Sequence, residues 1–176
     1  MRKLSMDELG RVSIEEFHKM EKLPVICILD NIRSQHNIGS IFRTADAFCV
    51  EELVLCGITA TPPNREINKS ALGATESVKW RYESDSTEAA LNLKKSGYKI
   101  IAIEQAEGSI PLSQFIFETD QPVAFVFGNE VNGVNESLMT IVDACIEIPQ
   151  FGTKHSFNVS VTAGIVLWDF FKFIKN

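Results

Sequence analysis

Short apolar runs, rich in β-branched and aromatic side chains, recur along the chain between polar loops and amphipathic segments. Runs of this kind are typical of strands buried on both faces of a parallel sheet, because neither face meets water. The runs are Val25–Leu29, Leu53–Cys56, Lys99–Ile103, Val123–Phe127 and Cys145–Ile148, and a further short strand is expected around Val78–Arg81. Apolar residues at helical spacing lie between and after them, at 41–48, 87–96 and 161–174. Strands that alternate with helices predict an α/β fold with a mainly parallel sheet flanked by helices.

The N-terminal part of the chain, residues 1–22, has a different pattern. From Ser5 to Lys22, apolar residues recur at roughly helical spacing among many charged ones, and Pro24 follows. This pattern predicts a peripheral amphipathic helix that packs one face against the rest of the protein. Charges occupy the place where a secretion signal needs its apolar core, and no apolar run is long enough to cross a membrane. We therefore expect a cytoplasmic protein.

Composition limits the architecture and the binding partners. With 176 residues the chain has room for one domain with a sizeable core, so we expect a single domain over 1–176. The formal net charge of −6 argues against a wholly basic nucleic-acid-binding surface, and any RNA contact would use a local patch. The widely spaced cysteines lack a C-x-x-C pair, so we expect buried free thiols and no metal site. They are Cys27, Cys49, Cys56 and Cys145.

The stretch 122–168 combines two predicted strands with two polar loops ahead of the last predicted helix. In open α/β sheets a ligand binds beyond the carboxyl ends of the strands. Gly128 and Gly133 would let the backbone approach such a ligand closely, and Ser156 or Asn158 would cap the final helix and leave amide groups facing it. Glycines after strands are also common in plain turns. From these residues alone, the plain turn is the stronger interpretation.

Three further connections, 30–39, 57–69 and 105–119, are longer than simple turns, and long loops are often functional. Arg43 lies near the N-terminal end of the helix predicted after the first of them. A cation there opposes the helix dipole. We expect that some other partner holds Arg43, and the alternative is a solvated surface arginine.

Three separated segments have an order and spacing that are far more specific than any one loop. They are NIGSIFRTA at 37–45, FGNEVNG at 127–133 and IPQFGTKHSFNVS at 148–160. Together they resemble the three motifs of the SpoU (TrmH) family of RNA ribose 2′-O-methyltransferases, within the SPOUT class. The resemblance covers residues 25–171, and KSALGA at 69–74 looks like a further family segment.

The resemblance implies more about the fold and the ligand than the residue pattern does. It implies a deep trefoil knot in the C-terminal part, about 122–176, a rare exception to the rule that chains are not knotted. It also implies S-adenosylmethionine bound by backbone groups of the knotted loops, and a homodimer whose site is completed across the interface. The implied cofactor-binding residues are Phe127, Gly128, Asn129, Gly133, Ile148, Pro149, Gly152, Phe157 and Asn158.

The same resemblance implies an enzyme that moves a methyl group from a sulfonium to a ribose hydroxyl. Arg43 is the implied central catalytic residue, supported by Asn37, Glu130, Ser156 and Asn158. Because a guanidinium stays protonated, we expect Arg43 to bind a phosphate and stabilise the developing alkoxide instead of acting as the base. Two roles stay open for Glu130. It would fix its loop and Arg43 through a carboxylate–guanidinium pair, which we favour, or act on the substrate directly.

The expected partner is RNA, and tRNA is favoured over rRNA because a small domain offers little surface for a large target. Arg33, Arg43 and Lys154 are the predicted RNA contacts, and Lys154 and His155 are more polar than family members often are at these positions. Ordinary solvent exposure is an equal alternative for Lys154 and His155. Further candidate phosphate contacts, or simply solvated cations, are Arg65, Lys69, Lys79 and Arg81.

Two other functions compete with this hypothesis. A noncatalytic relative would bind S-adenosylmethionine or RNA without transferring the methyl group, but the catalytic side chains at 43, 130 and 158 argue against it. A doubly wound nucleotide-binding module would carry G-x-G-x-x-G or a P-loop lysine after its first strand, and the loop 30–39 has neither.

Overall fold

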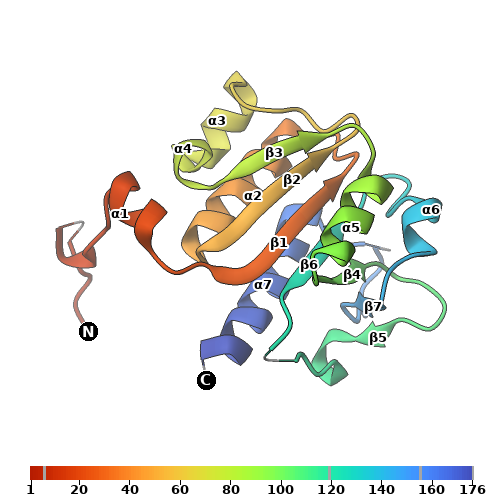
Figure 1. Cartoon of the computed structure of the whole chain (residues 1–176). Coiled ribbons are helices and arrows are strands. Elements are labelled where there is room, and N and C mark those ends of the chain that lie inside the picture. The colour runs from red at the N-terminus through yellow and green to blue at the C-terminus, as the bar shows by residue number, and fades with distance from the viewer. Residues whose placement is uncertain (6, 119, 155, 176) are drawn as a thin grey trace.

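A sheet of seven parallel strands forms the centre of the computed structural model, which describes residues 1–5, 7–118, 120–154 and 156–175 (Figure 1). The strand order is β3-β2-β1-β6-β4-β7-β5. The fold class predicted from the sequence is therefore confirmed. The strands are β1 (Leu23–Asp30), β2 (Val50–Cys56), β3 (Trp80–Glu83), β4 (Lys99–Ile103), β5 (Ile110–Pro111), β6 (Val123–Phe127) and β7 (Ala144–Glu147).

Helices cover both faces of the sheet, which explains why the strands are apolar without alternation. In β1, Val25, Cys27 and Leu29 face one core, while Ile26 and Ile28 face the other. The first core lies under α2 (Gln35–Ala47), α3 (Arg65–Ala71), α4 (Ala74–Ser77) and α7 (Val159–Lys175). The second lies under α5 (Ser86–Lys95) and α6 (Glu136–Met139) (Figure 1).

The central strands end at a common edge. Leu29 of β1 pairs with Phe127 of β6, Phe127 pairs with Ile103 of β4, and Ile103 pairs with Ile146 of β7. This register brings the loops after these strands together with the N-termini of α2 and α7. The trefoil knot in the C-terminal part stays a prediction.

The N-terminal segment does not form the one amphipathic helix that its sequence pattern predicts. A short 3-10 helix, η1 (Asp7–Leu9), is separated from α1 (Ile14–Lys19) by Gly10, which has a φ of 58°. Ser13 starts α1 with a capping box, and Phe17 is the buried residue of this helix. Leu4, Leu9, Val12, Ile14 and Met20 remain exposed, and the main helix contact of α1 among the described residues is with α4.

Two predicted loops end in helices. Ser34 caps α2 by accepting a hydrogen bond from the backbone N–H of Asn37, so the polar residues 35–39 form the first turns of a helix. Asn64 caps α3 in the same way, and α3 therefore begins inside the predicted loop 57–69. The connection 105–119 contains β5, which pairs with β7 at the edge of the sheet, and η2 (Leu112–Gln114).

The cysteines are free thiols, as predicted. Cys27 and Cys56 are buried, and Cys49 and Cys145 are half-buried. Burial raises the pKa of Cys27 and Cys56, so these thiols stay protonated and unreactive. Among the described residues, no helix is both long and apolar enough to span a membrane.

Candidate active site

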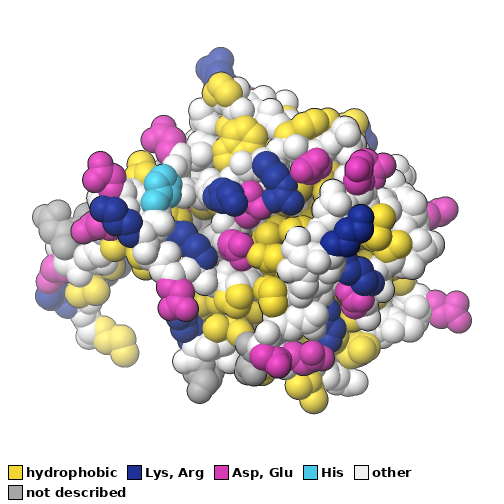
Figure 2. All heavy atoms as spheres, viewed as in Figure 1, with side chains coloured by type: hydrophobic (Ala, Val, Ile, Leu, Met, Phe, Trp, Pro, Cys, Tyr) yellow, Lys and Arg dark blue, Asp and Glu magenta, His cyan; other side chains and the backbone are white. Residues whose placement is uncertain are grey.

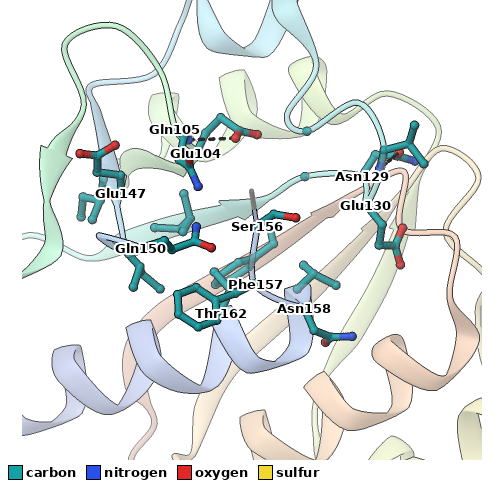
Figure 3. Close-up of a pocket in the computed structure, with 18 residues that line it drawn as sticks. Glu104, Gln105, Asn129, Glu130, Glu147, Gln150, Ser156, Phe157, Asn158 and Thr162 are labelled. Atoms are coloured by element: carbon teal, nitrogen blue, oxygen red, sulfur yellow. Dashed lines mark hydrogen bonds between the residues drawn. The ribbon is translucent and has the colours of Figure 1, made fainter. Parts of the chain in front are cut away.

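A pocket of about 570 Å³ lies beyond the carboxyl ends of β4, β6 and β7, at the start of α7 (Figure 3). Its walls come from four segments that are far apart in the sequence. The lining residues are Ile103–Gln105, Phe127–Val131, Gly133, Ile146–Ile148, Gln150, Ser156–Val159 and Thr162.

The loop after β6 closes on itself. The backbone N–H groups of Asn129 and Gly133 each donate to the carbonyl oxygen of the other at 2.9 Å. The Asn129 Oδ1 accepts from the backbone N–H groups of Val131 and Asn132, and its Nδ2 donates to the Asn31 carbonyl at 2.6 Å. Asn129 is therefore an organiser of the loop, which its hydrogen bonds attach to the end of β1.

Both glycines of this loop are required by close packing. A Cβ atom on Gly128 would lie 2.2 Å from the Val134 nitrogen, a backbone atom that cannot move aside easily. Gly133 has a φ of 70°, and a Cβ there would lie 2.2 Å from the Glu104 carboxylate. The plain-turn interpretation therefore accounts only in part for these glycines, because they also let the loop pack tightly at the pocket.

Glu130 connects the loop after β6 to the N-terminus of α2. Its carboxylate accepts hydrogen bonds from the backbone N–H groups of Arg33 at 2.9 Å and Ser34 at 3.0 Å, and from Asn37 Nδ2 at 3.1 Å. Partial burial acts to raise the pKa of Glu130, but these backbone and side-chain donors outweigh it and hold the pKa below its ordinary value. Glu130 therefore fixes its loop, as the favoured interpretation of the sequence predicted. Its partner, however, is the start of α2, whereas the sequence suggested Arg43.

Asn37 and Asn158 extend this connection to the last helix. Asn158 Nδ2 donates to Asn37 Oδ1 at 3.0 Å. Asn158 Oδ1 accepts from the backbone N–H and the hydroxyl of Ser160 in the first turn of α7, so Asn158 caps this helix. One hydrogen-bonded chain, Glu130–Asn37–Asn158, therefore joins residues from all three motifs.

Most predicted cofactor-binding residues line the pocket, and two do not. Pro149 and Gly152 are exposed and lie outside the lining. Among the predicted catalytic residues, Glu130, Ser156 and Asn158 line the pocket, and Asn37 contacts two of them. The predicted cofactor-binding residues in the lining are Phe127, Gly128, Asn129, Gly133, Ile148, Phe157 and Asn158.

Arg43 lies elsewhere. It is exposed on α2 and lines a second cleft of about 600 Å³, between the N-terminal segment 10–20 and α4. Its guanidinium has no hydrogen bond or ion pair among the described residues. Within one chain, Arg43 is therefore not a lining residue of the pocket that contains Ser156 and Glu130.

The basic residues suggested as RNA contacts fall into two groups. Lys79 and Arg81 form ion pairs with Glu52, which is only 4% exposed, so they neutralise a buried carboxylate of β2. Arg33 and Lys154 are exposed and close in sequence to pocket residues, while His155 lies outside the described residues. Figure 2 shows Lys and Arg interspersed with Asp and Glu on the face in view.

Sequence reasoning missed two acidic residues of the pocket. Glu104 follows β4, and its carboxylate accepts hydrogen bonds from the backbone N–H groups of Val134 at 3.0 Å and Gln105 at 2.9 Å. Glu147 ends β7 and also lines the pocket. Both lie where parallel strands end, and a charged residue at that position was the available signal.

Comparison with known proteins decides the family. The model of the SpoU rRNA Methylase family matches residues 24–168, which is most of the chain. The chain belongs to this family.

Relatives of this SpoU family member modify both rRNA and tRNA. It is 33% identical over 159 residues to the 23S rRNA (guanosine-2′-O-)-methyltransferase RlmB of Neisseria meningitidis serogroup B, covering 90% of this chain and 62% of the relative. It is 31% identical over 162 residues to the tRNA (guanosine(18)-2′-O)-methyltransferase of Thermus thermophilus, covering 92% and 81%. The chain thus spans about three fifths of the first relative and four fifths of the second.

Solved structures agree with the SpoU fold. The AdoMet-bound rRNA methyltransferase from Sinorhizobium meliloti superposes with a TM-score of 0.79 and 26% identity, covering 89% of this chain and 59% of that one. The A. aeolicus TrmH/SpoU tRNA modifying enzyme gives a TM-score of 0.81 and 25% identity, covering 92% and 82%. The described residues of this SpoU family member contain no group of His, Cys, Asp and Glu side chains able to hold a metal ion.

Replacing Glu130 with glutamine is expected to lower the free energy of unfolding by about 1 kcal/mol at neutral pH, because the start of α2 loses a charged acceptor. The lowered pKa means that this contribution is complete above the ordinary pKa of glutamate and is lost as the pH falls through the lowered value. Urea unfolding at several pH values measures the difference between the two proteins, which should shrink in acid.

The control for this prediction is Glu107→Gln, because Glu107 is exposed and its carboxylate has no hydrogen bond among the described residues. Equal stability of wild-type protein and Glu130→Gln at neutral pH would contradict the capping role.

Proposed function

We propose that this protein is an S-adenosylmethionine-dependent methyltransferase that methylates a ribose 2′-hydroxyl of RNA. The observation that supports this most is the Glu130–Asn37–Asn158 chain of hydrogen bonds, which joins the three motif segments at one pocket. The named activities of the Neisseria and Thermus relatives support the same reaction. An RNA substrate is consistent with a cytoplasmic location, which we also propose.

S-adenosylmethionine suits the pocket beside Gly128 and Gly133. Backbone groups there are not covered by side chains, and a Cβ at either position would collide with its neighbours. Phe127, Ile148 and Phe157 supply apolar walls for an adenine ring, and backbone groups of the loops 128–133 and 156–158 supply polar contacts. When bound, S-adenosylmethionine supplies the methyl group. The Sinorhizobium relative was solved with AdoMet bound.

We propose that Arg43 is the cationic catalytic residue. Its cationic guanidinium binds a phosphate of the RNA and stabilises the negative charge that develops on the ribose oxygen. Because Arg43 lines a different cleft from Ser156 and Glu130 in one chain, we propose that a homodimer completes the site, with Arg43 from one copy facing the pocket of the other.

An aromatic cluster formed by Phe48, which follows α2, and by Trp168 and Phe171 of α7 is the proposed dimer contact. Trp168 is 52% exposed, stacks on Phe171 with ring centroids 6.1 Å apart, and contacts Phe48 at 6.1 Å. A large aromatic residue exposed beside the arginine-bearing helix is typical of the centre of an interface.

Wild-type protein is expected to have a mass in solution of twice 19.7 kDa. Trp168→Glu should weaken the dimer by about thirtyfold or more, and it should lower methyl transfer in parallel. Leu91→Glu is the control, because Leu91 is 38% exposed on α5, the opposite side of the sheet. Light scattering across a concentration series measures both variants. A monomeric wild-type protein with full activity would contradict the shared site.

We propose tRNA as the substrate in preference to rRNA. The Thermus relative, which is 31% identical over 162 residues, is named as a tRNA (guanosine(18)-2′-O)-methyltransferase. Arg33 and Lys154, which are exposed near the pocket in sequence, are the proposed RNA contacts together with Arg43.

The experiment uses labelled S-adenosylmethionine and total RNA from a strain without this gene. After reaction with the purified protein, the RNA is separated by size. Label in the tRNA fraction is the expected result, label in rRNA alone would replace tRNA with rRNA as the substrate, and no label in either fraction would contradict the proposed activity.

A further inference from the structure

Among the described residues, the charged side chains that line the proposed cofactor pocket are all acidic. Glu104, Glu130 and Glu147 contribute carboxylates, and no lysine, arginine or histidine is present among the described lining residues. In Figure 3, Glu147, Glu104 and Glu130 lie to the left, above and to the right of Ser156, and the Glu130 carboxylate is turned toward the start of α2. A half-enclosed site of this kind has an effective dielectric constant below that of water, so its charges act strongly on the charge of a bound ligand.

Two of the three carboxylates already have partners in the protein. Both oxygens of Glu104 accept backbone N–H groups, from Val134 and Gln105. Both oxygens of Glu130 accept donors from the start of α2. Their first role is therefore to hold the loops around the pocket.

Glu147 is different from the other two. Its side chain is half-buried where β7 ends, and its carboxylate accepts no hydrogen bond and forms no ion pair among the described residues. A partly desolvated carboxylate without a protein partner favours a positively charged ligand. The field of Glu147 is thus available to whatever the pocket binds.

The donor and the product of methyl transfer differ by one charge. S-adenosylmethionine carries a sulfonium, an ammonium and a carboxylate, so it has one net positive charge. When the methyl group leaves, the electron pair of the broken bond stays on sulfur, and the product S-adenosylhomocysteine is a neutral thioether with no net charge. The acidic pocket therefore interacts with the two ligands differently.

We propose that Glu147 is a specificity-determining residue that makes the pocket bind the sulfonium donor more tightly than the thioether product. This inference rests on the proposed function, since it takes S-adenosylmethionine as the ligand. Its consequence is that the product leaves readily and inhibits weakly, because the transfer itself removes the charge that Glu147 attracts.

Calorimetric titration of the full chain without RNA tests the proposal with three probes: S-adenosylmethionine, S-adenosylhomocysteine, and sinefungin, in which an ammonium-bearing carbon replaces the sulfonium. Glu147→Gln keeps the shape of the side chain and removes its charge. We expect the affinity for S-adenosylmethionine and sinefungin to fall by about five- to tenfold, while the affinity for S-adenosylhomocysteine changes by less than about twofold.

Two further variants serve as controls. Glu147→Asp keeps the charge and should keep the preference for the donor. Glu88→Gln removes the same charge from an exposed position of α5 outside the pocket, and it should leave all affinities unchanged.

The outcomes separate this proposal from the proposed function. Equal losses for donor and product on Glu147→Gln, or no loss for either, would overturn the role of Glu147 while leaving the cofactor in place. Failure of the wild-type protein to bind any of the three probes would overturn the proposed function as well.

Discussion

Arg43→Ala is expected to retain affinity for S-adenosylmethionine and to lower methyl transfer by about two to three orders of magnitude. Arg43 lies outside the lining of its own chain's cofactor pocket, and in the proposed dimer it acts on the ribose oxygen and a phosphate of the RNA, so its removal should not disturb the donor. Its guanidinium has no hydrogen bond or ion pair among the described residues, so truncation should cost little stability. The proposed loss comes from the missing positive charge at the ribose oxygen and at a phosphate.

Single-turnover transfer to RNA measures this prediction, and titration of the donor measures binding separately. Lys95→Ala is the matched control. Lys95 is an exposed cation on α5, and its replacement removes the same unit of charge on the other side of the sheet. Near-normal turnover of Arg43→Ala would remove Arg43 from the mechanism.

Gly128→Ala is expected to lower the affinity for S-adenosylmethionine on the order of a hundredfold, because a displacement of about 1 Å in the loop misplaces its contacts. The new Cβ would lie 2.2 Å from the Val134 nitrogen and 2.3 Å from the Gly133 carbonyl carbon, so one of the two backbone segments must shift. Overpacking of this kind also costs about 1–3 kcal/mol of stability.

Calorimetry and thermal unfolding measure the two effects of Gly128→Ala. Gly164→Ala is the control, because nothing lies within 4 Å of a Cβ at that position and the glycine is inside α7. This control should bind normally and gain about 0.5–1 kcal/mol of stability. Unchanged donor affinity in Gly128→Ala would show that the loop after β6 is not part of the cofactor site.

The sequence predicts the fold well where periodicity is physically strong. The apolar runs of β1, β4 and β6 are buried on both faces, and that burial is what makes them apolar throughout. Short elements leave no such pattern. The two-residue strand β5 and the four-residue helix α6 are defined by their neighbours, and the start of α2 was hidden because its first turns are polar.

The sequence predicts which residues belong to the candidate site, but it does not predict which of them contact one another. The motifs indicated Glu130, yet its partners Arg33 and Ser34 are 97 and 96 residues away, and only the fold brings them together. The same holds for Asn158 and Asn37, which are 121 residues apart. The sequence also suggested pairing Arg43 with Glu130, whereas Glu130 binds the start of α2 beside the first pocket and Arg43 lines a different cleft.

Glu147 illustrates a different reason for a missed residue. It lies inside a predicted strand run, where a charge is easily taken as a solvated edge position. Only the packing of β7 beside β4 makes it a wall of the pocket.

The position of the transferred methyl group tests the central claim most directly. RNA methylated by the purified protein with labelled S-adenosylmethionine is hydrolysed in alkali, which cleaves every linkage next to a free 2′-hydroxyl. We predict that the label is recovered in an alkali-resistant dinucleotide, because a 2′-O-methyl group blocks cleavage at that nucleotide. Label recovered only in mononucleotides would place the methyl group on a base and contradict ribose methylation.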